Sequence, residues 1–562
     1  MTEAPMDFFL GDYQSAVEKA WEKIQKDRLT ERLWAKDYTL WKPTPEEIVN
    51  RLGWLEAPAE TLRRLDEILP VAEALRSQKI RDIFLIGIGG SSLAAEVFAN
   101  IFGVRPGYPR LHILDTTDPV FISEVARRMD VERSALMVSS KSGTTLEVAS
   151  LFGYFYRLAQ KKLGGAAGDK FFFITDEGSP LVRTAQTVSA ARIFLNNPDI
   201  GGRYSALSLT GMVPAALAGL PVQALLRQVS SRREILCRRG AALGAVLGTL
   251  AQSGRDKLTV VLPPAWTSFG DWLEQLIAES TGKEGRGILP VLNEKLDENR
   301  RWGNDRVFVF FRREGHPSPM ESLIRAGHPV ITLDIRDNIS LGEQMFVWET
   351  ATAVAAHFLK VNPFDQPDVE ATKKYTREVI AGLRENKKTA PQPPLGIFDG
   401  VAVFGKIRGA SLSAVLSDFL GQAKAGDYIC LQVFLNRSPD IEAAVRDLRD
   451  AIPLKYAVPV TCGWGPRYLH STGQLHKGDA GNGLFLQLTQ DFPADEEIPE
   501  SPDESRSSLT FGQLIAAQAQ GDFQALAEKK RRILRFHFKD NPAGELKTIV
   551  HFLQSISKTA NS

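Results

Sequence analysis

The sequence predicts an α/β protein in which two doubly wound parallel-sheet units follow one another and a third, C-terminal α/β lobe comes after them. Short β-branched or aromatic runs alternate with helical stretches after residue 80, and this alternation restarts near residue 257 and again beyond residue 395. Such alternation is typical of parallel sheets covered by helices on both faces. A chain of 562 residues suits about two to four units of roughly 100–200 residues each.

Local patterns place the elements of the first two units. Residues 1–80 are predicted to form a helical N-terminal segment, because apolar residues recur there at three- and four-residue spacing among many charged ones. The first unit is predicted to span residues 81–245 and the second residues 246–388, with a long helix over residues 342–360. Their predicted strands are residues 82–86, 111–114, 135–139 and 171–175 in the first unit, and 257–262, 307–311 and 330–333 in the second.

The third lobe is predicted over residues 395–562, after the linker-like sequence TAPQPP at residues 389–394. Its predicted strands are residues 401–404, 428–434 and 484–488. The acidic stretch at residues 491–508, rich in Pro and Ser, predicts a mobile loop, and the basic stretch at residues 527–535 predicts a helix near the end of the chain.

The composition excludes several classes of partner. Lys and Arg (68) balance Asp and Glu (67), so the net charge of +1 gives no broad positive field for nucleic acid or an anionic membrane. The three cysteines are widely separated and form no CxxC pair, which argues against a disulfide framework and fits a reducing cytoplasm. The N-terminus has no basic region followed by a long apolar core, and no uncharged apolar run of about 18 residues follows, so we expect neither export nor membrane insertion.

Two loops at the ends of predicted strands carry groups suited to an anion. In DIFLIGIGGSSLAAEVF, Gly89, Gly90 and Ser91 stand where a strand gives way to a helix, so the backbone can approach a ligand and the helix N-terminus faces it. The same glycines also suit an ordinary tight turn, and that alternative stays open. The loop lacks the P-loop lysine and the full GxGxxG pattern, which disfavours a nucleotide.

The second loop distinguishes a ligand site from an ordinary turn better than the first loop does. In ALMVSSKSGTTLEVASLF the predicted strand ends in hydroxyl groups and one cation, namely Ser140, Lys141, Ser142, Thr144 and Thr145. Several hydroxyls, an ammonium group and a helix N-terminus in one turn suit a phosphate monoester, whereas an ordinary helix cap explains only one hydroxyl. Two such loops, without a basic surface, predict a small phosphorylated ligand at the carboxyl edge of a parallel sheet.

The motifs GIGGSSLA and SSKSGTTLE resemble those of the sugar isomerase (SIS) domain. Three further segments narrow the resemblance to the glucose-6-phosphate isomerase family, namely IGGRYSALSLTGM at residues 200–212, QLIAESTGKEG at 275–285 and NPFDQPDVEATKKY at 362–375. The chain is most similar to the isomerase half of transaldolase and glucose-6-phosphate isomerase fusion proteins, although no transaldolase portion is recognisable. The resemblance implies two tandem SIS domains and interconversion of glucose 6-phosphate and fructose 6-phosphate, with no cofactor and no metal.

An aldose–ketose isomerisation moves a proton between two carbons through a cis-enediolate, so it requires a carboxylate base, an oxyanion stabiliser and a group that helps to open the ring. The resemblance implies Glu279 as the base, Arg203 as the stabiliser and Lys373 as the group at the ring oxygen. It further implies substrate contacts for Gln275, Gln366, Gly90, Ser91, Ser140, Lys141, Ser142, Thr144 and Thr145. From the residues alone, Glu279 could instead pair with Lys283, and Lys373 could lie on a solvated helix face.

One departure from the family concerns ring opening. The family has a histidine after the base, and this chain has none between Glu279 and His316. The third lobe carries His470 and His476 in the segment GPRYLHSTGQLHKGDAGNG, and histidine is the side chain whose ordinary pKa lies nearest neutrality. In the family the neighbouring subunit supplies this histidine, so we expect one of these two to replace it from within the chain. The alternative, that they decorate an accessory loop, stays open.

Two other hypotheses remain at this stage. The first is a catalytically weak regulatory protein that binds sugar phosphates, which the missing histidine would suit. The second is an isomerase of a related sugar phosphate such as mannose 6-phosphate, because the phosphate loops do not distinguish one sugar epimer from another. Retention of Glu279, Arg203 and Lys373 favours the enzyme. We expect a metal-independent cytoplasmic isomerase of a small sugar phosphate, without nucleic-acid or membrane partners. It would be a homodimer or, if the third lobe completes the site, a monomer.

Overall fold

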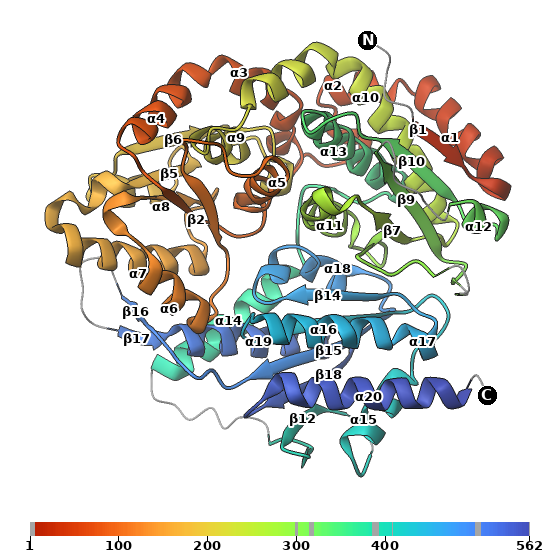
Figure 1. The fold of residues 1–562 in the computed structure, drawn as a ribbon. Helices are drawn as coiled ribbons and strands as arrows, with labels where there is room; N and C mark the ends of the chain where they lie inside the picture. The colour runs from red at the N-terminus through yellow and green to blue at the C-terminus, as the bar shows by residue number, and fades with distance from the viewer. Residues whose placement is uncertain are drawn as a thin grey trace.

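A computed structural model describes residues 6–297, 300, 302–313, 320–384, 393–406, 409–500 and 507–560. His316, most of the predicted linker and residues 501–506 of the predicted acidic loop lie outside this part of the chain. Figure 1 shows three α/β lobes, the first in orange and yellow, the second in green and the third in blue beneath both. The predicted fold class, with parallel sheets in tandem and a third α/β lobe, is confirmed.

The first unit contains a five-stranded sheet in the order β3-β2-β4-β5-β6, and every pair in it is parallel. Alternate residues of β2 enter two different cores, with Ile83 and Leu85 on the side of α5 and α9, and Phe84 and Ile86 on the side of α6, α7 and α8. Burial on both faces explains the continuous apolar runs in the sequence. The elements are β2 (Asp82–Ile86), α5 (Leu93–Phe102), β3 (Arg110–Leu114), α6 (Pro119–Arg128), β4 (Ser134–Ser139), α7 (Leu146–Leu163), β5 (Phe171–Asp176), α8 (Pro180–Thr187), β6 (Arg192–Asn196) and α9 (Leu209–Leu217).

The second unit has the strand order β1-β10-β9-β7-β8, in which β1 is antiparallel to β10 and the other pairs are parallel. The N-terminal segment is therefore not helical throughout, since its first described residues add an edge strand to this sheet before the helices begin. The elements are β1 (Met6–Phe9), α1 (Gln14–Lys26), α2 (Leu29–Trp34), α3 (Ala57–Arg63), α4 (Leu65–Ser77), α10 (Val222–Gln252), β7 (Lys257–Val261), α11 (Thr267–Thr281), β8 (Leu289–Leu292), β9 (Arg306–Arg312), α12 (Met320–Arg325), β10 (Val330–Asp334) and α13 (Ser340–Leu359).

The third lobe has a six-stranded sheet in the order β11-β12-β18-β15-β13-β14, parallel from β18 to β14. The helix predicted over residues 527–535 is wrong: α19 ends at Glu528 and β18 occupies the centre of the sheet, because the alternating apolar side chains of RILRFHF suit a strand. The elements are α14 (Val369–Arg384), β11 (Gly396–Phe398), β12 (Val401–Gly405), α15 (Leu412–Leu420), β13 (Tyr428–Phe434), α16 (Pro439–Ala451), α17 (Pro453–Tyr456), β14 (Val460–Trp464), α18 (Gly473–Gly478), β15 (Gly483–Gln490), α19 (Phe511–Glu528), β18 (Arg532–Phe538) and α20 (Pro542–Ala560).

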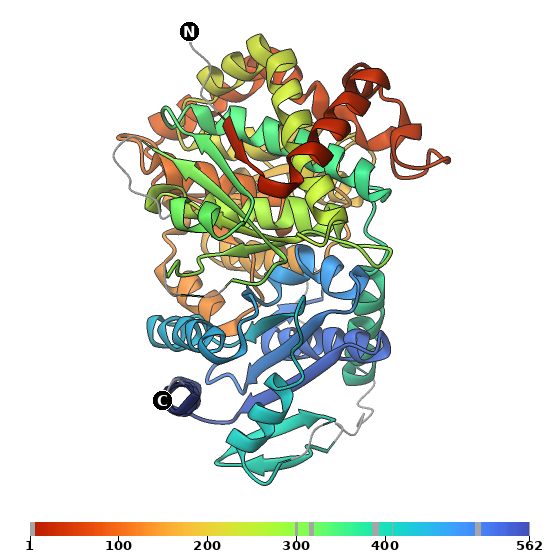
Figure 2. The ribbon, with the colours of Figure 1, turned by 90° about the vertical axis from the view of Figure 1, so that its right-hand side faces the viewer.

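Part of the predicted acidic loop is ordered. Residues on either side of the undescribed stretch form a small antiparallel pair, β16 (Glu497–Pro499) and β17 (Ser507–Thr510). Ile498 and Leu509 are buried in the core on the α7 side of the first sheet, so the pair is held by apolar anchors that the acidic composition conceals. Figure 2, turned by 90°, again shows the third lobe beneath the other two. Within the described residues, no helix is long and apolar enough to cross a membrane.

Helices α10 and α13 pack closely enough that glycine is required between them. A Cβ added at Gly244 would lie 2.5 Å from the Ala351 oxygen, and Gly240 and Gly248, one turn to either side, are equally close to α13. The predicted boundary between residues 245 and 246 falls inside α10, so the chain continues without a break from the first unit into the second. This close contact ties the two units together.

We expect Gly244→Ala to lower the free energy of unfolding by about 1–3 kcal/mol through overpacking, although alanine alone favours a helix over glycine by about 1 kcal/mol. Urea unfolding of the full chain measures the change. The matched control is Gly153→Ala in α7, where the added Cβ would meet only the Pro499 oxygen, at 3.9 Å. It should leave stability unchanged or raise it, and an equal gain in both variants would contradict the close packing.

Candidate active site

The first glycine loop lies where both units and the third lobe meet. It follows β2 and forms a 3₁₀-helix, η5 (Gly89–Ser91), ahead of α5, with Gly89 at a φ of +57° that favours glycine. A Cβ at Gly89 would lie 2.9 Å from Gln275 Nε2 and 3.0 Å from His470 Cβ, and one at Gly90 would lie 2.2 Å from the Gly202 oxygen. These glycines therefore allow three other segments to approach one turn of backbone.

The hydroxyl loop that follows β4 presents its side chains at the N-terminus of α7. Ser140 Oγ accepts from the Gly143 N–H at 3.1 Å and lies 3.3 Å from Thr145 Oγ1. Ser142 Oγ accepts from Thr144, from the N–H at 3.2 Å and the hydroxyl at 3.1 Å. Thr145 occupies the N-cap position, yet within the described part of the chain its side chain makes no capping hydrogen bond. The helix N-terminus thus keeps N–H groups for an anion, which is the arrangement expected of a phosphate site.

Lys141 is held by protein groups on the same edge of the sheet. Its ammonium group forms an ion pair with Asp176 at the end of β5 and donates to the Pro198 oxygen at 2.6 Å. Burial raises the pKa of Asp176, and Lys141 works against that shift. The lysine therefore adds positive charge beside the hydroxyl loop from a fixed position.

Arg203 and Glu279 form the buried ion pair of the site. Arg203 lies in the 3₁₀-helix η8 (Gly202–Tyr204), Glu279 lies on α11, and Arg203 Nη1 is 3.2 Å from Glu279 Oε1. Their side chains are only 4% and 13% exposed. Arg203 Nη2 also donates at 2.7 Å to the Phe364 oxygen and to the side-chain oxygen of Gln366. A guanidinium fixed on two sides is well placed to stabilise an oxyanion without reorganising.

Gln275 joins this pair to the third lobe. Its Nε2 donates to Glu279 Oε2 at 3.1 Å and to the His470 main-chain oxygen at 2.7 Å. The amide oxygen is buried and has no hydrogen-bond partner among the described residues. Gln275 is therefore suited to accept a hydrogen bond from a sugar hydroxyl.

The alternative partner for Glu279, Lys283, is occupied elsewhere. The Lys283 ammonium group donates to Asp365 Oδ1 at 2.7 Å and to the Asn362 oxygen at 2.6 Å, and its side chain is 1% exposed. Burial, together with the charge of Arg203, lowers the pKa of Lys283 to about 8. Lys283 thus fixes the segment that carries Gln366, while the Glu279 carboxylate contacts Arg203 and Gln275.

His470, on the 3₁₀-helix η10 (Arg467–His470) of the third lobe, lies against the first unit. Its Nε2 is 2.9 Å from Glu147 Oε1, on the first turn of α7, and Gln518 of α19 donates to the same oxygen at 2.7 Å. Burial alone would lower the pKa of His470, but the adjacent Glu147 carboxylate outweighs it and raises that pKa. Burial alone would raise the pKa of Glu147, but the contact with His470 and the charge of Lys373 outweigh burial and lower that pKa. The arrangement favours an imidazolium beside a carboxylate.

The other two predicted ring-opening groups lie differently. Lys373 of α14 is half exposed and donates to Glu370 Oε1 at 2.6 Å, although its charge acts on Glu147 and His470. His476 is fully buried in the third lobe, among the rings of Tyr428, Tyr468 and Phe485. Burial lowers the pKa of His476 to about 3, so this imidazole stays neutral at ordinary pH.

Two residues of the site were not predicted. Glu147 stands inside the motif SSKSGTTLE, where its place directly after the hydroxyl loop is the signal that could have singled it out. Gln518 has no comparable signal, because it lies on a helix whose contact with the first unit depends on the docking of the third lobe.

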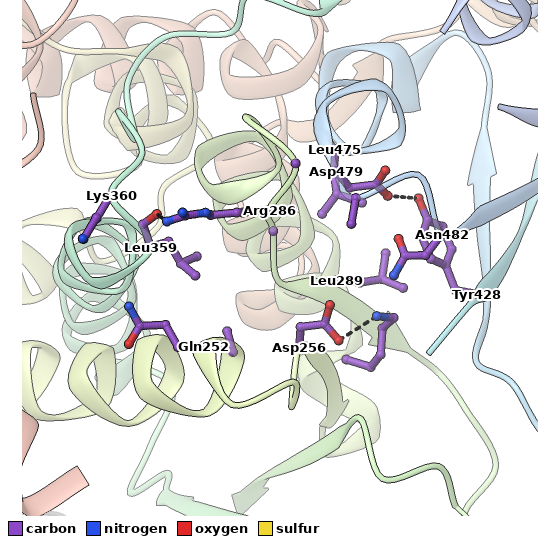
Figure 3. A pocket seen from close by; sticks show the side chains of 15 residues that line it. Gln252, Asp256, Arg286, Leu289, Leu359, Lys360, Tyr428, Leu475, Asp479 and Asn482 are labelled. Carbon is purple, nitrogen blue, oxygen red and sulfur yellow. Dashed lines mark hydrogen bonds and ion pairs between the residues drawn. The ribbon is translucent and has the colours of Figure 1, made fainter. Parts of the chain in front are cut away.

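A cavity of about 420 Å³ lies away from these residues, between the second unit and the third lobe (Figure 3). Asp256 pairs with Lys257, and Tyr428 donates to Asp479 at 2.8 Å. None of the predicted site residues lines it. Across the described residues, no group of three or more His, Cys, Asp or Glu side chains is placed to hold a metal ion.

Comparison with known proteins identifies the class. The profile described as phosphoglucose isomerase matches residues 70–228. The glucose-6-phosphate isomerase of Rubrobacter xylanophilus is 30% identical over 393 residues, which cover 58% of this chain and 88% of the relative. The glucose-6-phosphate isomerase of Streptococcus pyogenes serotype M18 is 26% identical over 398 residues, which cover 59% of this chain and 86% of the relative. A crystal structure of a hypothetical protein from Thermus thermophilus is 25% identical with a TM-score of 0.57, covering 67% of this chain and 100% of that one.

The parallel sheets and these relatives define an isomerase of sugar phosphates. Within that class, the chain belongs to the glucose-6-phosphate isomerase family. The expected enzyme is thereby favoured over a regulatory binding protein.

Ser142→Ala and Thr145→Ala, made as separate variants, should each raise the Michaelis constant for the sugar phosphate about tenfold or more, since each hydrogen bond to a charged group contributes about 1.5–3 kcal/mol. The melting temperature should change little. The control is Ser411→Ala, which removes a hydroxyl that does cap a helix, α15, through the Ala414 N–H. That variant should lose stability and keep its Michaelis constant. A large loss of melting temperature with unchanged affinity in the Ser142 and Thr145 variants would assign these hydroxyls to the fold.

Proposed function

We propose that the protein interconverts glucose 6-phosphate and fructose 6-phosphate through a cis-enediolate, a step of glycolysis and gluconeogenesis, and that His470 of the third lobe helps to open the sugar ring. The observation that carries this proposal is the convergence of Glu279, Arg203 and His470, which come from three different lobes, around the Gly89 turn and Gln275. The named relatives support the choice of substrate.

The phosphate is proposed to bind the hydroxyl loop at residues 140–145 and the N-terminus of α7. Glu147 lies on the first turn of this helix and holds His470, so a phosphate at the loop sets the distance between the sugar ring and the imidazole. A rigid anchor of this kind converts binding energy into orientation.

In the ring-opening step the His470 imidazolium gives a proton to the ring oxygen as the bond between that oxygen and C1 breaks. The anomeric hydroxyl loses its proton to water, and C1 becomes an aldehyde. The raised pKa of His470 increases the protonated fraction that this step needs near neutral pH. Lys373, through its electrostatic effect on the same pair, adjusts this equilibrium.

In the isomerisation step Glu279 removes the proton from C2, and the electrons move to the C1 oxygen. Arg203, held by Phe364 and Gln366, stabilises the resulting enediolate. Glu279 returns the proton to C1 while the C2 hydroxyl proton passes to the C1 oxygen, which leaves a ketone at C2. The unpartnered oxygen of Gln275 accepts from a substrate hydroxyl and orients the reacting carbons.

His476 has no part in this scheme, because it is sealed in the third-lobe core. Since His470 comes from the same chain, we propose that a single chain holds a complete site and acts as a monomer in the cytoplasm. The free cysteines are compatible with a reducing compartment.

Glu279→Gln should lower the rate of isomerisation by about 10²–10⁴, the usual contribution of a general base, because the amide keeps the shape but cannot take the proton. The exchange between the α and β anomers of glucose 6-phosphate, measured by magnetisation-transfer NMR, should continue to be catalysed, since it requires only opening and closing of the ring. Glu284→Gln, in an exposed pair with Lys42, is the control and should change neither rate. Isomerisation at the parent rate in Glu279→Gln would exclude this residue as the base.

His470→Ala should slow anomer exchange by about 10²–10⁴, also in the Glu279→Gln background, where isomerisation no longer contributes. Glu147→Gln removes the charge that raises the pKa of His470. Because the protonated imidazole is the active form, the loss of exchange at high pH should then begin at a lower pH than in the parent. Anomer exchange at the parent rate in His470→Ala would disprove its role in ring opening.

A further inference from the structure

Arg467 begins the 3₁₀-helix that His470 ends, and it contacts both isomerase units. Its guanidinium forms an ion pair with Glu96 of α5, lies 3.2 Å from Asp115 Oδ2 just after β3, and lies 3.8 Å from Asp271 Oδ2 on α11. The side chain is only 17% exposed. One residue of the third lobe is thus bound to acids from three segments of the two other units.

The same segments carry the rest of the active site. Helix α5 follows directly from the Gly89 turn, and α11 carries Asp271, Gln275 and Glu279 at four-residue spacing, which places them on one face of the helix. Along that face, Asp271 pairs with Arg467, Gln275 binds the His470 main chain, and Glu279 pairs with Arg203. A shift of Arg467 relative to α11 therefore displaces η10 relative to the base.

Packing holds Tyr468 and Leu469 of η10 within the third lobe, but it does not hold the Arg467 end against the other two units. Arg467 lines two cavities, of about 700 Å³ and 680 Å³, one on the side of the second unit and one on the side of the first. Cavity walls lack the dense contacts that hold a side chain inside a core. Between these cavities, the ion pairs of Arg467 join the third lobe to α5 and α11.

The positive charge of Arg467 offsets the negative charges of the carboxylates around it. Burial raises the pKa of Asp115, and the charge of Arg467 opposes that shift. Without the guanidinium, the carboxylates of Glu96, Asp115 and Asp271 would have no cation between them, and partly buried acids of like charge repel or take up protons. Lysine keeps the charge but lacks the planar, multi-donor geometry that can reach three acids at once.

We propose that Arg467 is a positioning residue for ring opening: by binding acids of both isomerase units, it holds η10, and with it His470, against the Gly89 turn. This inference rests on the proposed role of His470. The lobe has other attachments, such as Gln474 with the Gly282 oxygen and Gln518 with Glu147, so it stays docked when the ion pairs of Arg467 are weakened.

The test is anomer exchange of glucose 6-phosphate by the full chain carrying Arg467→Lys. A misplacement of about 1 Å can cost a factor of about 10², so we expect exchange to fall by about 10- to 100-fold, with little change in the Michaelis constant because the phosphate loop is untouched. Asp271→Asn, in a half-exposed carboxylate, should cause a smaller loss and guards against misfolding of the arginine variant. Arg232→Lys is the matched control, since Arg232 is 18% exposed and paired with Glu343 away from the site.

A double variant separates positioning from a general loss of structure. If Arg467 acts through His470, then Arg467→Lys should add no further loss of exchange in the His470→Ala background. Exchange at the parent rate in both Arg467→Lys and Asp271→Asn, or an equal loss with and without His470, would overturn this inference alone. Parent-like exchange in His470→Ala would instead overturn the proposed ring-opening role, and the inference with it.

Discussion

Glu147 Oε1 accepts hydrogen bonds from His470 at 2.9 Å and from Gln518 at 2.7 Å, and both donors belong to the third lobe. Glu147 itself stands on the first turn of α7, next to the hydroxyl loop. A buried carboxylate without its donors carries a large desolvation cost, so the docked lobe is favoured by the same contact that places the imidazole. Docking of the third lobe on the first unit and placement of the His470 imidazole therefore depend on the same carboxylate.

The charges of the site are arranged in linked pairs, and each pair draws on two lobes or two elements. Arg203 of the first unit meets Glu279 of the second, and His470 of the third lobe meets Glu147 of the first. Buried pairs of this kind add little net stability, because desolvation offsets their attraction. These pairs instead orient the side chains of the site, since each side chain is fixed by a partner on a different element before substrate binds.

The sequence was sufficient for the fold class and for most of the central strands, because residues buried on both faces form continuous apolar runs such as DIFLI in β2 and VFVFF in β9. It failed for the edge strands β1, β6, β8 and β14, which pair on one side only and need less apolar sequence. It also failed for the central strand β18, whose basic residues suggested a helix. At the site, motif resemblance pointed to Glu279 and Arg203. No local pattern could choose His470 over His476, since that choice depends on which side chain faces a neighbouring lobe.

On our proposal the third lobe supplies a catalytic group from within the chain, and this changes what the activity depends on. When a partner subunit supplies such a group, the fraction of complete sites falls on dilution; a tethered group keeps an effective concentration fixed by the fold. The contacts of α18 with α11 and of Gln518 with both Glu147 and Thr117 spread this tether over several elements. The third lobe would then take the place of a partner subunit. Its contribution to catalysis would come from one short helix, η10, which is held at the junction of the other two units.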